Sequence, residues 1–215
     1  MTKVKKVLLI ALITFSLVAV LTVPFVYAYF YQEKAIEDDK TFGHIKAISE
    51  VYFTKNGRID AVYSNTIDGF VKPDIYQVDI SNLDNNYYIN NLNVDIKVKT
   101  NIDVYLRVMI NDAILIRRAT SEGYRELSFA NTGIEYALDE NWYYDQTSNW
   151  YYYIGKIDES VNWQVFSFVV PGTLYDVLPN RRVELEIVVE SAQAHLGAEN
   201  NWGMTFDGQN WEKEE

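Results

Sequence analysis

The fold is decided by residues 91–110, NLNVDIKVKTNIDVYLRVMI. Every second position in this stretch is apolar, both before and after the central Thr100-Asn101 pair. These positions are Leu92, Val94, Ile96 and Val98 in the first half, and Ile102, Val104, Leu106, Val108 and Ile110 in the second. A period of two over this length is typical of strands with one face in the core. The stretch therefore predicts two half-buried β-strands.

The junction between these two strands limits how they can pair. A two-residue turn at Thr100-Asn101 would set Lys99 opposite Ile102, an outward residue opposite an inward one. Directly opposed residues in a sheet share a face, so that register is wrong. Either the loop has three residues, or the chain crosses to a second sheet at this point.

Strand patterns of the same kind recur along the rest of the chain. Asn56-Gly57 separates two apolar runs and is a strong hairpin signal. Further short segments rich in β-branched and aromatic residues are DIYQVDI (74–80), AILIRR (113–118), YRELSF (124–129), WYYYIGKI (150–157), WQVFSFVV (163–170) and VELEIVVES (183–191). Only residues 190–201 look briefly helical, and we expect Gly197 and Asn200-Asn201 to stop that helix early. Roughly nine or ten short strands predict an all-β, antiparallel, two-sheet β-sandwich over residues 42–215.

The N-terminus predicts export. A basic cluster at residues 3–6 precedes an uncharged, mostly apolar run from Val7 through Phe30, long enough for a hydrophobic helix that spans a bilayer. One interpretation is a signal peptide over residues 1–28, cleaved between Ala28 and Tyr29; the other is an uncleaved membrane anchor. Residues 29–41 are largely charged and lack an apolar period, so we expect a flexible arm. In both interpretations the lysines keep the N-terminus in the cytoplasm, and the domain lies outside the cell.

Composition narrows the possible partners and chemistry. The chain contains no Cys, which excludes disulfides and thiol catalysis. Its net charge of -11 repels phosphate backbones and argues against nucleic-acid binding. Cations, basic proteins or a polyvalent wall surface are easier partners for such a chain, and the charge also keeps a protein soluble.

Catalytic and metal-binding signatures are missing from the sequence. His44 and His195 are the only two histidines, and neither an H-E-x-x-H motif nor a G-x-S-x-G turn occurs. Oxygen-bearing residues at 83–86 and 139–142 could offer ligands to Ca²⁺ or could be ordinary solvated turns. We therefore predict no catalytic residue, no cofactor and no metal site.

Residues 142–155, WYYDQTSNWYYYIG, hold the densest group of aromatic side chains. Tyr143, Trp150 and Tyr152 alternate and could stack against sugar rings as a contact surface. Cross-strand aromatic pairing explains the same pattern and is worth ~0.2–1 kcal/mol per pair. Because aromatics occupy consecutive positions, we predict a hairpin with one face in the core and the other face available as a contact surface.

Several segments together resemble the TasA/camelysin family of exported proteins. The segment ending VYAYF is similar to signal peptides handled by the SipW-type peptidase. NIDVYLRVMI, WYYYIGKI and the C-terminal VELEIVVESAQAHLGAENNWG resemble strands of that family. The resemblance implies a jelly-roll-like sandwich outside the cell and association by donation of an N-terminal strand to a neighbour's sheet edge. The Pro-Gly loop usual after the aromatic strand is replaced by DESVN here, with Pro171-Gly172 occurring later.

These observations lead to one expected function and two alternatives. We expect a non-enzymatic structural protein of the cell surface or extracellular matrix, such as a biofilm fibre, which associates with itself or with other surface proteins. The first alternative is a carbohydrate- or cell-wall-binding module that uses the aromatic hairpin. The second is a camelysin-like metalloprotease, for which the sequence offers no metal site.

Overall fold

The computed structural model describes residues 43–63, 74–130 and 132–213. Residues Gly43–Glu215 form one compact unit, and the described part of it is built almost entirely from antiparallel strands. This confirms the predicted all-β class. The hydrophobic N-terminal helix, the Ala28–Tyr29 cleavage site and the arm at 29–41 lie outside the described residues. Within the described ranges, no helix is long and apolar enough to cross a membrane.

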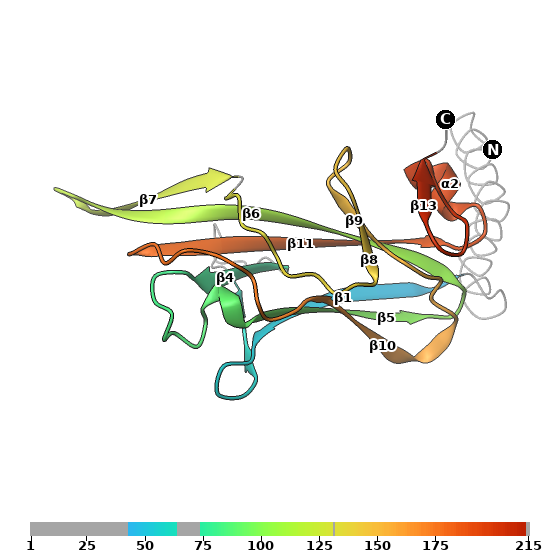
Figure 1. Ribbon diagram of the computed structural model, residues 1–215, viewed down its shortest axis with the longest axis horizontal. Coiled ribbons are helices and arrows are strands. Elements are labelled where there is room, and N and C mark those ends of the chain that lie inside the picture. Colours follow the sequence, from blue (N-terminus) through green and yellow to red (C-terminus); the bar gives the residue numbers. More distant parts are fainter. Residues whose placement is uncertain (1–42, 64–73, 131, 214–215) are drawn as a thin grey trace, which may run out of the picture. The chain divides into compact units, whose positions relative to one another are not determined.

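The strands form two main sheets and one small hairpin (Figure 1). The smaller sheet has the order β10 (Ser160–Val169), β5 (Leu92–Thr100), β1 (Ile45–Phe53) and β2 (Ile59–Asp60). The larger sheet has the order β3 (Val62–Tyr63), β4 (Ile75–Asp79), β11 (Arg181–Gln193), β6 (Val104–Thr120), β9 (Trp150–Tyr153) and β8 (Trp142–Asp145), and β7 (Gly123–Ala130) also pairs with β6. A separate hairpin joins β12 (Met204–Phe206) to β13 (Trp211–Lys213), and the short helices are η2 (Ile89–Asn91) and α2 (Gly197–Trp202).

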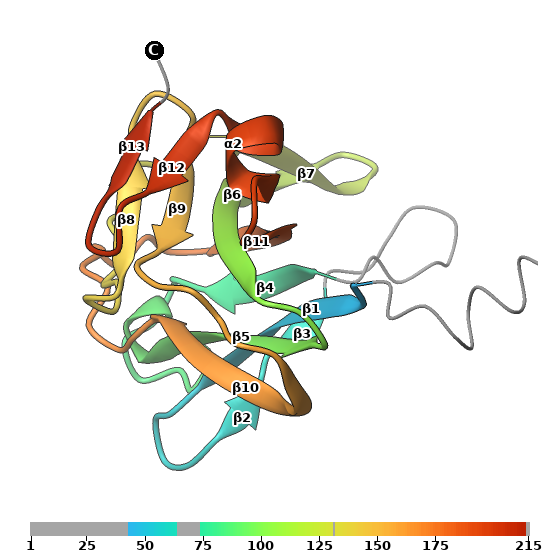
Figure 2. The same ribbon diagram turned by 90° about the vertical axis from the view of Figure 1, so that its right-hand side faces the viewer.

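The chain crosses from one sheet to the other between β5 and β6. β5 is central in the smaller sheet and β6 is central in the larger one, so the second of the two predicted alternatives is correct. The Thr100 side chain stabilises this crossing. Its Oγ1 donates to the Ile102 carbonyl at 2.7 Å and accepts from the Ile102 N–H at 3.2 Å. Figure 2 shows β5 and β6 diverging from this point into separate sheets.

Both sheets contribute to one hydrophobic core. Leu92 and Ile96 of β5 and Val108 and Leu185 of the larger sheet are completely buried in the same cluster. The inward positions predicted from the period of two are therefore correct for these strands. Removing apolar side chains from water is the main driving force for folding, so this shared core holds the two sheets together.

Two elements differ from the prediction. Residues 113–118 are not a separate strand, because β6 runs without a break through Asn111-Asp112 to Thr120. Asp112 stays in the strand because it accepts hydrogen bonds from the hydroxyls of Tyr136 and Thr132. Residues 190–193 of the predicted helix belong to β11, and the helix itself spans Gly197–Trp202 and is capped by Gly203, whose φ is 62°. The expectation that Gly197 and Asn200-Asn201 would stop it is therefore wrong.

Candidate functional site

The aromatic hairpin is formed by β8 and β9, joined by a turn that Asp145 organises. The Asp145 carboxylate accepts from the Thr147 N–H at 2.9 Å and from the Ser148 hydroxyl at 2.6 Å. These bonds, with that of Ser148 the largest contribution, lower the pKa of Asp145 below its usual value. Asn149 closes the turn with a φ of 61°, a conformation that Asn adopts more readily than most residues. The predicted hairpin is thus confirmed.

One face of this hairpin lies in the main core. The Trp142 ring is buried, with its centroid 4.8 Å from that of Phe168, and its Nε1 donates to the Ser167 carbonyl at 2.7 Å. Tyr151 packs edge-on against the same Phe168 ring at 5.2 Å. Burial raises the pKa of Tyr151 to about 12. This face therefore holds the hairpin in place, and its exposed part is Tyr144, which stacks on Tyr151 and is 38% exposed.

The opposite face carries the three residues predicted as a contact surface. Tyr143 pairs with Tyr152, and Trp150 lies two residues from Tyr152 on the same strand, so they share a face as predicted. The structure nevertheless buries Tyr152 to 1% exposure. Trp150 is partly buried and Tyr143 is 40% exposed. The prediction that Tyr152 is part of an accessible surface is therefore wrong.

The segment after β11 covers this face. The ring centroid of Tyr152 lies 5.1 Å from that of Trp211 on β13 and 5.9 Å from that of Trp202 on α2. The Trp211 indole N–H donates to the Tyr153 carbonyl at 2.9 Å. Figure 2 shows α2, β12 and β13 beside β9. We call residues 197–213 the C-terminal cover, because they form a second aromatic cluster over the hairpin.

Arg107 of β6 links this cluster to the larger sheet. Its guanidinium carbon lies 4.1 Å from the ring centre of Trp150 and 4.7 Å from that of Trp202. The same guanidinium forms an ion pair with Glu190 of β11 at 2.5 Å. Arg stacks on aromatic faces through its planar, weakly hydrated charge. Trp150 therefore helps to hold the C-terminal cover in place. The sequence of the aromatic hairpin alone did not show that Arg107 would stack on the Trp150 ring.

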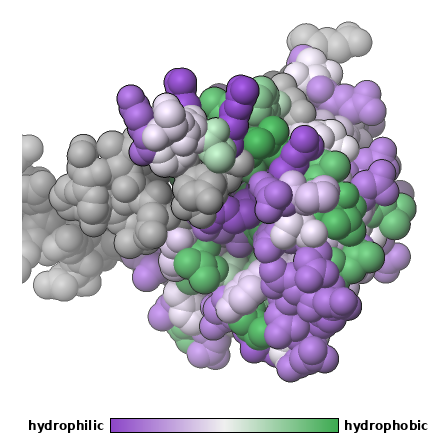
Figure 3. Space-filling model, turned by 90° about the vertical axis from the view of Figure 1, so that its left-hand side faces the viewer, coloured by the Kyte–Doolittle hydropathy of each residue, from purple (hydrophilic) through white to green (hydrophobic). Residues whose placement is uncertain are grey.

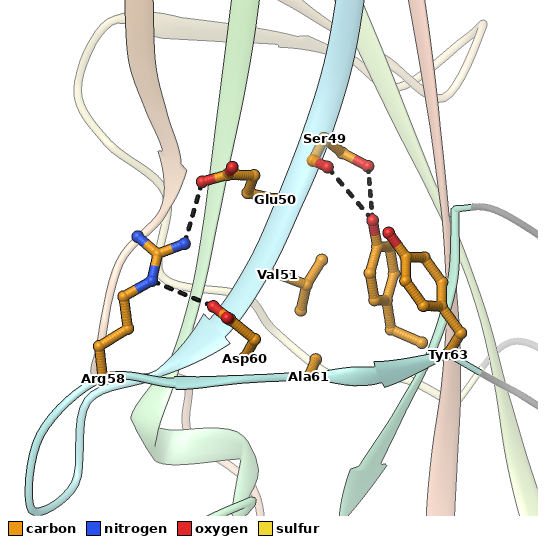
Figure 4. A pocket seen from close by; sticks show the side chains of 8 residues that line it. Ser49, Glu50, Val51, Arg58, Asp60, Ala61 and Tyr63 are labelled. Carbon is orange, nitrogen blue, oxygen red and sulfur yellow. Dashed lines mark hydrogen bonds and ion pairs between the residues drawn. The ribbon is translucent and has the colours of Figure 1, made fainter.

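A second site lies at the outer edge of β1 and is drawn in Figure 4. It is a cavity of about 260 Å³ where the chain passes from β2 to β3. At one end, the Tyr76 hydroxyl donates to the Ser49 carbonyl at 3.2 Å, and the Tyr63 ring packs on Tyr76 with centroids 4.9 Å apart. Burial raises the pKa of Tyr76 well above its usual value. This end is aromatic and closed.

The other end of the cavity is charged. The Arg58 guanidinium binds Glu50 at 2.9 Å and Asp60 at 3.1 Å (Figure 4), and it stacks over the Tyr52 ring at 4.0 Å. Lys97 of β5 also binds Glu50, at 2.5 Å. The hydrogen bond from Lys97 is the largest of the effects that lower the pKa of Glu50. The charges at this end are therefore paired within the chain.

The backbone of β1 explains why this cavity lies at an open edge. The Val51 carbonyl accepts from the Ala61 N–H at 2.9 Å, so Val51 directs its backbone polar groups away from β5. In an antiparallel pair alternate residues direct these groups to the same side, which places those of Ile45, Ala47 and Ser49 at the same edge. β2 pairs only with Tyr52 and Phe53, and no strand of the described part pairs with Ile45–Ser49. At this edge the Ser49 carbonyl accepts from the Tyr76 hydroxyl, and no strand of the described residues pairs with Ile45 or Ala47.

The Ser49 hydroxyl, within 3.2 Å of the Tyr76 hydroxyl, has no histidine among the residues that line its cavity. Across residues 43–63, 74–130 and 132–213 no group of three or more His, Cys, Asp or Glu could hold a metal ion. At 139–141 the Asp139 carboxylate accepts from the Asn141 N–H at 3.1 Å and caps a turn. Figure 3 shows the end of the molecule with the β6–β7 tip, where apolar side chains form separate small patches among hydrophilic ones.

Comparison with known proteins gives no relative: no family model, no curated protein and no solved structure matches the chain.

Proposed function

We propose that the protein is a non-enzymatic structural component of the cell surface or extracellular matrix, built on a jelly-roll-like β-sandwich. Two antiparallel sheets that share one core support the sandwich. The sequence of residues 1–28, with the pattern of an export signal or a membrane anchor, supports an extracellular role. Secretion or tethering by the N-terminus places the sandwich outside the cell.

Assembly proceeds by donation of the arm at 29–41 to the open edge of β1 in a neighbouring copy. The observation that carries this proposal is the edge of β1 at Ile45–Ser49, with which no strand of the described residues pairs, although the Ser49 carbonyl at its end accepts from the Tyr76 hydroxyl. A strand advances about 3.3 Å per residue, so an arm of this length reaches about 40 Å, more than the length of β1. The cavity of Figure 4 lies beside the same edge and can receive a side chain of the added strand.

Negative-stain microscopy of the exported protein tests this assembly. We expect fibres from the unaltered protein at high concentration and none after deletion of residues 29–41. Ala47→Pro should also abolish fibres, because it removes an N–H that faces the open edge without touching the β5 pairing. Ala47→Val is the matched control, since it changes the side chain and keeps the N–H. A protein that stays monomeric at high concentration, or an Ala47→Pro variant that still polymerises, would contradict the proposal.

A further inference from the structure

β10, at the other end of the smaller sheet, is an edge strand of unusual composition. Its ten residues, SVNWQVFSFV, contain no charged side chain and no proline. Proteins normally protect edge strands with charges, prolines or very short length. Here β2 carries Asp60, β7 carries Arg125, β8 carries Asp145, and β3 has only two residues. β10 thus lacks the charges, the prolines and the short length that protect the other edges of the described sheets, and its own protection is a bulge relative to β5 between Ser160 and Gln164.

The most exposed large side chains of β10 are apolar, with the polar Asn162 and Ser167 exposed beside them. Val161 is 78% exposed, Trp163 40% and Val165 54%, and the three alternate along one face of the strand. A bulge relative to β5 lies between Ser160 and Gln164, which adds local twist at this edge. Exposed apolar groups in a row on an uncharged edge favour burial against another strand.

The open part of this edge is short and well defined. Toward the C-terminal end of β10, the Asp139 N–H donates to the Phe168 carbonyl at 3.0 Å and the Val170 N–H donates to the Ala137 carbonyl at 2.8 Å. Residues 137–139 therefore cover the edge from about Ser167 onward. No strand of the described part pairs with the outer edge of residues 161–165.

These five residues read the same in both directions by chemical type: Val, Asn, Trp, Gln, Val. In an antiparallel pair of two copies centred on Trp163, Val161 of one copy faces Val165 of the other, and the two Trp163 residues face each other. Asn162 then faces Gln164, an amide opposite an amide. A twofold interface requires this kind of self-complementarity, because the same patch is used on both subunits.

The charges around β10 are compatible with such a pair. The chain carries a net charge of -11, so two copies repel each other over most of their surface. On the solvent face of the neighbouring strands, however, the nearest charged groups are lysines, with the Lys46 ammonium 5.6 Å from the centre of the Trp163 ring. Glu159, just before β10, would face Ser167 of the partner copy, beside Asp139, so acidic residues approach each other at the two ends of the pair and not at its centre.

We propose that a second copy of this chain pairs antiparallel with β10 across residues 161–165, centred on Trp163. The pair joins two smaller sheets into one continuous sheet. This interface is separate from the arm and the β1 edge, and it does not depend on the proposed fibre assembly. Together the two contacts would connect fibres laterally.

Cysteine cross-linking tests the register directly, because the natural chain has no Cys. Facing residues in a sheet have Cα atoms about 4.5–5.5 Å apart, within the range that a disulfide spans. We expect Trp163→Cys protein to form disulfide dimers under mild oxidation. Val161→Cys and Val165→Cys should cross-link when mixed, and neither with itself, since identical residues there lie four positions apart, about 13 Å. Leu174→Cys, 78% exposed outside β10, is the control.

Each outcome decides for or against the pair. Cross-linking of Trp163→Cys no faster than that of Leu174→Cys, or self-cross-linking of Val161→Cys as fast as the mixture, would overturn it. If Trp163→Cys fails to fold, as judged by circular dichroism, the mixed pair of valine variants carries the test. Repeating the mixture after deletion of residues 29–41 should leave the dimer intact; its loss would assign the contact to the arm and overturn the proposal, whatever the fate of fibre formation.

Discussion

The two faces of the aromatic hairpin are made from the same residue types and serve different parts of the molecule. The face with Trp142 packs into the core that both sheets share. The face with Tyr152 packs into a smaller cluster that residues from the C-terminal cover complete. The first face contributes to the stability of the whole domain. The second contributes mainly to keeping one terminal segment in place. Aromatic content alone thus says little about exposure or function.

Trp142→Ala should produce the largest loss. The variant leaves a cavity in the shared core and removes the hydrogen bond to the Ser167 carbonyl. We expect a loss of about 3–5 kcal/mol in the free energy of unfolding, measured by urea denaturation. If Trp142→Ala loses less stability than Trp211→Ala, the face with Trp142 is not the one that stabilises the whole domain.

Trp211→Ala should act more locally. It removes the ring that contacts Tyr152 and the indole N–H that binds the Tyr153 carbonyl. We expect a global loss of about 2 kcal/mol and a larger local effect, with rapid amide exchange confined to residues 197–213 and to β9. Hydrogen exchange measured by mass spectrometry distinguishes the global loss of stability from the local opening of the cover. Equal acceleration across β5 and β6 would contradict an independent role for the cover.

Arg107→Leu isolates the contribution of the stacked guanidinium. The variant keeps an apolar stem between Trp150 and Trp202 and removes the ion pair with Glu190. We expect the free energy of unfolding to fall by about 1–2 kcal/mol. High salt should lower the stability of the unaltered protein by part of this amount, because it screens the ion pair. Arg107→Lys is the matched control, because it keeps the charge and loses the planar stack. If both variants are as stable as the unaltered protein, Arg107 does not hold the cover.

Tyr151 gives the core face a dependence on alkaline pH. Its pKa is raised to about 12 by burial, above the ordinary value of 10.0, so the folded state favours the neutral phenol. The resulting stability is present below pH 10 and is lost as the pH rises from about 10 to about 12. Tyr151→Phe should therefore lose less stability across that window, by about 1 kcal/mol after allowance for solvent screening. Identical pH profiles of the melting temperature would refute this.

Tyr143→Ala should have the smallest effect. Its ring is 40% exposed, so we expect a change within about 0.5 kcal/mol. Retention on glycan and cell-wall columns should also stay unchanged if the protein is structural. Lost retention in this variant, with stability unchanged, would favour the carbohydrate-binding alternative.

The sequence predicted the strands well where burial follows a period of two. Val183, Leu185 and Ile187 point into the core, and the alternate positions 184 and 186 between them are glutamates. The hairpin at 56–57 was predicted correctly because Asn56 and Gly57 accept positive φ, here 60° and 105°. These signals are local, so no tertiary information was needed.

The accessible surface could not be predicted in the same way. Consecutive aromatics in 150–153 indicate that both faces of the strand are covered, but not by which segment. The cover comes from Trp202 and Trp211, some fifty residues later, and no local pattern links them to Tyr152. Asn111-Asp112 likewise looked like the end of a strand, since polar residues there have no local partner. The hydroxyl groups that bind the Asp112 carboxylate come from Thr132 and Tyr136, more than fifteen residues away in the sequence.

The position of β11 has a consequence for biosynthesis. β11 lies between β4 and β6, yet it is synthesised after every other strand of the larger sheet. Until residue 193 has been made, β4 lacks its main partner and the register from Arg181↔Ile116 to Gln193↔Val104 cannot form. Such long-range pairing makes folding slow and late. The larger sheet is therefore completed only after β11 has been synthesised, whereas β1 and β5 of the smaller sheet can pair before it.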